Sequence, residues 1–230
     1  TDVTNSPVLG GGSWPRGTPD QYIFNTGVQL VGIIPSNAGF EWAGDTVGAW
    51  AIDTRGPAEH MQGLTGIYNS LNSDDLANWP SAAYVRDTSI FHSSLIGRQS
   101  ISQQDTWVRY CDGSPGLVTG RSHTMGLLVE QRSLAWNFPT GNEDLIYFIF
   151  RFTNITARAS SGAYSGLADL GYSAADIAEV GALGDLFQAQ SEAAFNVAIP
   201  DGGYNINNTF VAFTADMDVG DATNNYATGD

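Results

Sequence analysis

Two apolar segments separated by a short polar turn constrain the fold of this chain most strongly. Residues 126–138 (GLLVEQRSLAWNF) and 145–154 (LIYFIFRFTN) are rich in branched and aromatic residues, which favour strands. Residues 139–144 contain Pro, Gly and Asn, which is typical of a hairpin or a sandwich corner. The second segment begins with six apolar residues in a row. We therefore predict a central strand that is covered on both faces over most of its length.

Other segments also carry strand patterns. Residues 22–34 predict a strand pair or one kinked strand, with Gly27 and Gly32 as bend or bulge positions. The remaining predicted strands are 44–53, 104–110 and 204–213. Both faces of the segment 44–53 carry apolar residues, which suits a strand inside a sandwich.

One segment changes from strand to helix periodicity. Residues 173–195 contain an apolar stripe at helical spacing, and Ser173 with Asp176 forms a capping pair at the start. Gly181 and Gly184 within the helix either weaken it or allow it to lie close to a sheet. The stripe consists of Ile177, Val180, Leu183 (or Gly184) and Phe187, flanked by Leu186.

The order of these segments predicts a mainly β chain. The simplest architecture is a two-sheet, jelly-roll-like β-sandwich with one flanking α-helix at about 174–195. We expect a loop-like N-terminal arm at 1–20 and a single domain at 21–230. A long irregular insertion at about 55–105 would contain one or two helical turns at 72–80, capped by Ser73.

Charge and composition exclude several functions. The formal net charge is −15 and the nine basic residues are all Arg, so the surface repels nucleic acid and anionic lipid. No apolar run is long enough to span a membrane. Cys111 is the single cysteine, which excludes an internal disulfide and a cysteine-based zinc site. Two segments, 154–156 and 207–209, match the acceptor pattern for N-glycosylation.

The C-terminal segment is crowded with side-chain oxygens. A D-x-D-x-G-D pattern follows the last predicted strand, and no Lys or Arg lies among its carboxylates. Such a cluster repels itself unless a cation lies between its members, and Ca²⁺ takes six to eight oxygen ligands. We therefore predict a calcium site, with a solvated acidic turn as the alternative. The candidate ligands are Asp216, Asp218, Asp221, Asn224, Asn225 and Asp230.

Acidic residues also flank two of the predicted strands. Asp45 and Asp53 bracket the strand at 44–53, and Glu143 with Asp144 precedes the strand at 145–154. If the ends of a sandwich bring these corners together, they could complete a metal shell or pair for glycoside hydrolysis. Exposed Trp side chains could then serve as a platform for sugar. Carbohydrate binding or hydrolysis is therefore the alternative function.

Three segments resemble one group of proteins. Residues 12–27 (GSWPRGTPDQYIFNTG), 142–156 (NEDLIYFIFRFTNIT) and 215–230 (ADMDVGDATNNYATGD) resemble segments of large secreted or cell-surface β-rich proteins of environmental bacteria. Those proteins often carry a C-terminal sorting or anchoring module. The resemblance implies an extracellular β module stabilised by calcium, and no known catalytic activity. This chain has Asn224 and Asn225 where the group usually carries Asp pairs.

We therefore expect a non-enzymatic structural or assembly module. Its location would be extracellular or at the cell surface, on the outer-membrane or periplasmic side. Its partners would be other protein subunits or the remainder of a longer chain, with a glycan as the alternative ligand. We expect no nucleic acid and no membrane span, and a module that polymerises or docks into a larger complex is a third reading.

Overall fold

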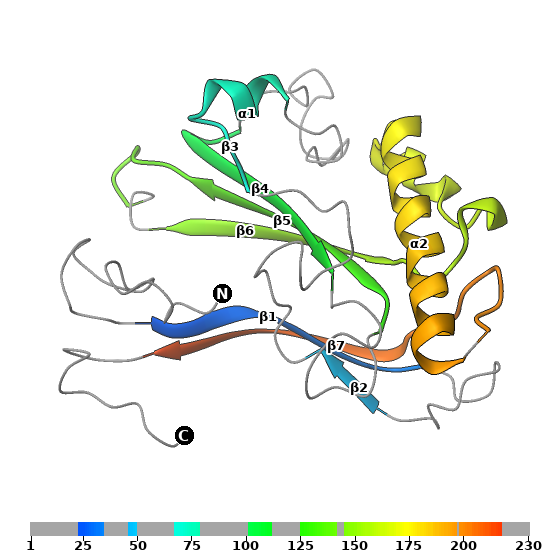
Figure 1. Ribbon diagram of the computed structural model, residues 1–230. Coiled ribbons are helices and arrows are strands. Elements are labelled where there is room, and N and C mark those ends of the chain that lie inside the picture. Colours follow the sequence, from blue (N-terminus) through cyan, green and yellow to red (C-terminus); the bar gives the residue numbers. More distant parts are fainter. Residues whose placement is uncertain are drawn as a thin grey trace.

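The computed structural model describes residues 23–34, 46–49, 67–78, 101–111, 125–141, 145–196 and 198–217. These residues form seven strands and two α-helices (Figure 1), so the protein is mainly β as predicted. The strands are β1 (Ile23–Ile33), β2 (Thr46–Ala49), β3 (Tyr68–Asn69), β4 (Gln104–Cys111), β5 (Leu127–Ala135), β6 (Ile146–Asn154) and β7 (Asn207–Met217). The helices are α1 (Ser73–Ala77) and α2 (Ala174–Phe195).

The strands form two antiparallel sheets. One has the order β2-β1-β7 and the other has the order β3-β4-β5-β6. The pairing of β1 with β7 brings Val28 opposite Phe213 and shifts register between Val31 and Ile33. Gly32 lies at that shift, where an added Cβ would come within 2.6 Å of the Ile206 side chain. The bend predicted at Gly32 is therefore a place of close approach, where a larger residue would not fit.

Both sheets contribute to one buried cluster. Strands β1, β4 and β5 supply its strand residues. Since successive side chains of a strand point to opposite faces, Cys111 and Leu128 of this cluster lie on the face that also carries Arg109 and Glu130. Where β6 faces β7, the rings of Phe148 and Phe213 stack with 5.8 Å between their centroids. Figure 1 shows α2 standing across one end of the two sheets. The cluster includes Val28, Leu30, Tyr110, Val129, Val180, Leu183 and Phe187.

Helix α2 begins where the sequence predicted. The Ser173 hydroxyl accepts a hydrogen bond from the Asp176 amide at 3.2 Å, and the Asp176 carboxylate accepts one from the Ser173 amide at 2.9 Å. Gly184 gives the helix a close approach, because an added Cβ would lie 2.1 Å from the carbonyl oxygen of Ala157. The helix is thus close to the segment that follows β6, and its buried stripe completes the core.

Strand β6 differs from its prediction as a central strand. It is the last strand of its sheet among the described residues, and Ile146 at its start is 62 % exposed. A continuous apolar run is typical of a strand covered on both faces. Sheet order depends on pairing between distant segments, however, and here it leaves the start of an apolar strand at an edge. None of the nine residues of β6 is buried, so the prediction of coverage on both faces is wrong.

Two smaller predictions also change. Helix α1 begins after Asn72, whose side-chain oxygen accepts from the amides of Asp74 and Asp75, so Asn72 is the cap instead of Ser73. The last strand extends from 207 to 217 instead of 204 to 213. The predicted arm at 1–20 and most of the insertion at 55–105 lie outside the described residues.

Candidate functional sites

The predicted calcium ligands fall mostly outside the described residues. Only Asp216 is included, and its backbone lies in β7 opposite Asn25. Among the residues that are described, no three His, Cys, Asp or Glu side chains gather as a metal site. Neither described helix is both long and apolar enough to cross a bilayer. The other candidates, and all acidic corners, lie outside: Asp45, Asp53, Glu143, Asp144, Asp218, Asp221, Asn224, Asn225 and Asp230.

A buried ionic cluster lies on the outer face of the four-stranded sheet. Arg109 of β4, Glu130 of β5 and Arg151 of β6 are direct cross-strand neighbours. Arg109 donates from Nε at 3.2 Å and from Nη2 at 3.0 Å to Glu130 Oε1. Arg151 Nη1 lies 3.7 Å from Glu130 Oε2. The register of the three strands thus places one guanidinium on each side of the Glu130 carboxylate.

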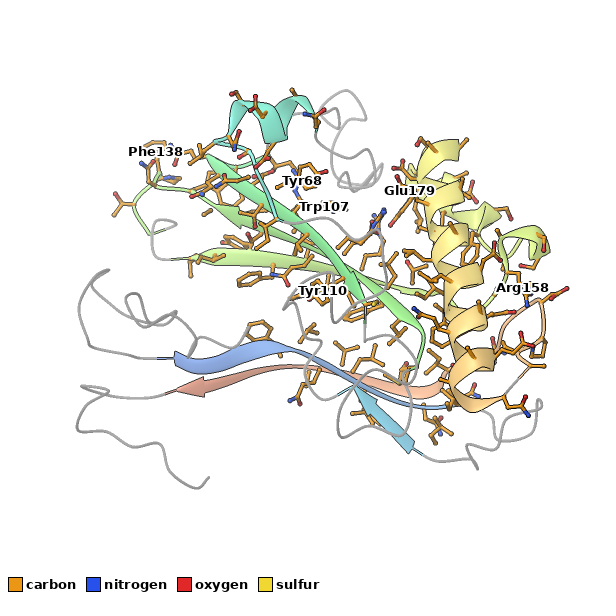
Figure 2. All side chains as sticks on the ribbon, viewed as in Figure 1. Tyr68, Trp107, Tyr110, Phe138, Arg158 and Glu179 are labelled. Atoms are coloured by element: carbon orange, nitrogen blue, oxygen red, sulfur yellow. The ribbon has the colours of Figure 1, made fainter. Side chains whose placement is uncertain are left out.

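Residues near α2 cover this cluster. The Tyr172 hydroxyl donates to Glu130 Oε2, and Arg109 Nη1 donates to Glu179 at 3.0 Å. The guanidinium of Arg151 lies 4.8 Å from the centre of the Tyr172 ring, which is a cation–π distance. Figure 2 shows Glu179 on α2 at the side that faces the sheet. The ionic cluster therefore ties the start of α2 to the sheet.

The electrostatics of Glu130 follow from its burial. The residue is 4 % exposed. Burial raises the pKa of the Glu130 carboxyl above its ordinary value, while Arg109 and Arg151 lower it in part. Burial also lowers the pKa of Arg151, which the neighbouring Glu130 partly restores. Burial has the largest effect on the pKa of both groups, so keeping Glu130 and Arg151 charged at this site costs free energy.

A second ion pair extends the same face. Asp105 is fully buried, accepts from the amides of Ile101 at 2.8 Å and Ser102 at 2.9 Å, and pairs with Arg132. Trp107 lies between the two ion pairs in sequence, and the ring of Tyr68 meets it edge-on at 5.6 Å between centroids (Figure 2). The buried face is thus partly polar, with each carboxylate bound to an arginine and a further donor.

This arrangement anchors segments of the chain. A general acid, general base or nucleophile needs an atom that can reach a substrate. Glu130 and Asp105 instead direct their oxygens to Arg side chains, a tyrosine hydroxyl and backbone amides. Sequence analysis missed the cluster, although opposite charges share one strand face in 105–109 (Asp105 and Arg109) and in 130–132 (Glu130 and Arg132). That pattern signals ion pairs only when the strand register is known.

A polar junction joins the end of β6 to the segment before β7. The Asn154 amide donates to the carbonyl of Tyr204 at 2.6 Å, and its oxygen accepts from the Thr156 hydroxyl at 2.7 Å. Gln188 of α2 donates to the carbonyl of Thr156 at 2.7 Å. The first glycosylation-like motif therefore holds three segments together. The second, 207–209, lies exposed at the start of β7.

A set of exposed apolar side chains lies on two strands that face each other. We call it the seam, and it occupies the two strands that end their sheets, β6 and β7. Phe210 is 73 % exposed and Phe213 is 54 % exposed, even though Phe213 stacks on Phe148. Exposed apolar patches of this kind mark contact surfaces. The seam consists of Ile146, Tyr147, Phe148, Phe210, Val211 and Phe213.

The described tryptophans differ in their exposure. Trp107 is buried, whereas Trp136 is half-buried and meets the exposed Tyr147 edge-on at 5.6 Å between ring centroids. The exposed Phe138 is close to Trp136 in sequence, and Figure 2 shows it at the far end of the sheet from α2. The other four tryptophans lie outside the described residues.

Comparisons with known proteins add no relative. The chain matches no protein-family model, no curated protein and no solved structure.

Proposed function

We propose that this chain is a non-catalytic structural or assembly module that contacts another protein subunit through the seam. The module would be a two-sheet, jelly-roll-like sandwich acting outside the cell or at its surface. The observation that carries the proposal is the seam itself, a set of exposed apolar side chains on two facing strands of different sheets. The resemblance to secreted bacterial β proteins supports the location.

Physical chemistry favours a protein partner for the seam. Fully burying one large apolar side chain stabilises by about 1.5–3 kcal/mol. The six seam side chains carry no charge, in a protein whose net charge is −15. Interfaces are likewise depleted of charge at their centre and enriched in aromatic residues. A protein surface can cover such a strip more completely than water or a small ion can.

A photo-crosslinking amino acid placed at Phe210 tests this function in cells that produce the protein. We expect a discrete covalent adduct with a protein chain, either the same chain or another. The matched control places the photo-crosslinker at Ala182, which is exposed on α2 outside the seam. Equal adducts at both positions, or none at Phe210, would contradict assembly through the seam.

Calcium is the second part of this proposal. Strand β7 leads directly into the acidic segment, and Asp216 lies within the strand. Extracellular sites of this type bind Ca²⁺ with Kd on the order of 10⁻⁴–10⁻³ M. We expect EDTA to lower the melting temperature, Ca²⁺ to restore it, and the Asp216→Ala/Asp218→Ala variant to respond to neither. A wild-type melting temperature that ignores both reagents would remove calcium from the proposal.

Carbohydrate binding is the alternative, and the half-exposed Trp136 beside Tyr147 favours it. Aromatic faces of this kind can stack on sugar rings. A polysaccharide pull-down distinguishes the two functions. Retention that Trp136→Ala abolishes, together with no adduct at Phe210, would favour the carbohydrate function over assembly.

A further inference from the structure

Among the described strands, β6 ends the four-stranded sheet, and its outer edge, here called the free edge, has the properties of a strand acceptor. The strand has nine residues and pairs with β5 without a register shift. It contains no proline, and Arg151 is its single charged residue. Natural edge strands are usually protected by shortness, charge, proline or a bulge. β6 therefore lacks most of the features that prevent an edge from pairing with another strand.

The other sheet edges differ in these features. Strand β3 has two residues and β2 has four, so both are short. Strand β7 is long, but its pairing with β1 shifts register at two places. Such irregularities twist an edge away from flat pairing. Among the edges of the described strands, β6 offers the longest regular one.

The hydrogen bond between the Ile155 amide and the Gly126 carbonyl, at 2.8 Å, fixes which backbone groups face this edge. Ile155 is thereby in a hydrogen-bonded pair, and such pairs alternate along an antiparallel ladder. Odd-numbered residues of β6 consequently bond to β5. The even-numbered residues direct their N–H and C=O groups to the free edge: Ile146, Phe148, Phe150 and Phe152.

We propose that a second copy of this chain pairs its β6 antiparallel to this edge, around a two-fold axis at Ile149. This inference deepens the proposed assembly function and rests on it. Residues 146–152 of each copy would overlap fully. Phe148 would then lie opposite Phe150 of the second copy, and Ile146 opposite Phe152, as hydrogen-bonded pairs. The two four-stranded sheets would become one continuous eight-stranded sheet.

The side chains of β6 suit a copy of itself. In this register Arg151 lies opposite Tyr147 of the second copy, so the single charge of the strand never meets its equivalent. An axis perpendicular to the sheet keeps inner faces on the same side. The stacked row Phe148, Phe150 and Phe152 would therefore continue across the axis. Cross-strand aromatic pairs of this kind stabilise sheets.

The net charge makes the proposal testable by salt. Each copy carries −15, so two copies repel at long range. Added salt screens that repulsion, and we expect the dimer to become tighter as salt increases. Sedimentation velocity over a concentration series, at low and at high salt, measures this. A protein that remains monomeric under all these conditions would overturn the self-pairing.

Substitutions at Phe148 separate backbone pairing from side-chain packing. Phe148→Pro removes an N–H that faces the free edge and leaves the bonds to β5 intact. Phe148→Ala is the matched control, because it loses the same ring but keeps the N–H. We expect Phe148→Pro to dimerise at least about tenfold more weakly than Phe148→Ala. Equal dimerisation of two variants that both unfold cooperatively would contradict the proposal.

A cysteine at the axis gives a test that does not depend on those variants folding. Cys111 is the single native cysteine and is fully buried, so an introduced thiol reacts alone. Ile149 would face itself in a non-hydrogen-bonded pair with Cα atoms about 4.5 Å apart, which permits a disulfide. We expect Ile149→Cys to form a covalent dimer under mild oxidation.

Ala212→Cys, on the exposed part of β7, is the control for this experiment. Cross-linking at Ala212 that equals or exceeds cross-linking at Ile149 would overturn pairing through β6. The result also separates the two proposals. An adduct at Phe210 with a different protein, with no disulfide at Ile149, would leave the assembly function standing and remove the second copy as the partner.

Discussion

The outer face under α2 buries charged side chains, whereas the seam exposes apolar side chains. Under α2, the charges of Arg109, Glu130 and Arg151 are buried and meet each other. At the seam, large apolar side chains are exposed. Buried charges and exposed apolar patches are both informative departures from an ordinary surface. The first region pairs its charges within the chain, whereas the second exposes apolar groups that another molecule could cover.

Removing the Glu130 carboxylate from the ionic cluster should have the largest effect on stability. Glu130→Ala leaves Arg109, Arg151 and the Tyr172 hydroxyl without their shared acceptor. We expect the free energy of unfolding to fall by about 3–5 kcal/mol, measured by urea denaturation. Glu179→Gln is the control, because Glu179 binds the same Arg109 but is 67 % exposed. A similar loss of unfolding free energy in both variants would show that the burial of Glu130 does not cause the effect.

A smaller effect should follow from crowding α2. Gly184→Ala forces a methyl group against the carbonyl oxygen of Ala157 and the hydroxyl of Tyr164. Overpacking of this kind costs about 1–3 kcal/mol, and thermal unfolding measures it. Gly166→Ala has no atom within 4 Å of its added Cβ and serves as the control. Equal stability of the two variants would mean that α2 can shift without cost.

The pH dependence of stability should distinguish charge from packing under α2. Because burial raises the folded pKa of Glu130, its contribution is fully present below the unfolded pKa and is lost as pH rises through the folded pKa. The stability of wild type relative to Glu130→Gln should therefore fall as pH rises. Each pH unit between the two pKa values changes the difference by about 1.4 kcal/mol. Urea denaturation across this pH range measures it, and a difference that rises with pH would reverse the sign.

The smallest effect on stability is expected at the seam. Phe210→Ser replaces a side chain that is mostly exposed, so the free energy of unfolding should change by less than about 0.5 kcal/mol. Phe187→Ala in the buried cluster should cost about 3–5 kcal/mol by contrast. Urea denaturation compares the two. A large loss at Phe210 would mean that the seam packs within the chain and needs no partner.

Local patterns account for the elements that sequence analysis predicted well. Local signals specify structure within a few residues in the predicted strand at 104–110, in the apolar segments before and after the turn at 139–144, and in the Ser173–Asp176 capping pair. These signals act through neighbours in the chain, so no knowledge of the sheets is needed to use them.

Features that depend on distant pairing were missed. The edge position of β6 and the ionic cluster both follow from the order β3-β4-β5-β6, which no local pattern specifies. Arg109 and Glu130 meet only because their strands pair in one register. The calcium site at Asp216 to Asp230 stays a prediction, since all but the first of its residues lie outside the described part.

The pairing of β1 with β7 has a consequence for how the protein forms during synthesis. Ile23 pairs with Met217, so this end of the ladder cannot form until residue 217 has been synthesised. The sheet of β3 to β6 has all of its strands once residue 154 has emerged from the ribosome. β1 must therefore remain unpaired with β7 while the residues between them are translated. We expect the pairing of these two strands, which are far apart in sequence, to be the slowest step of folding.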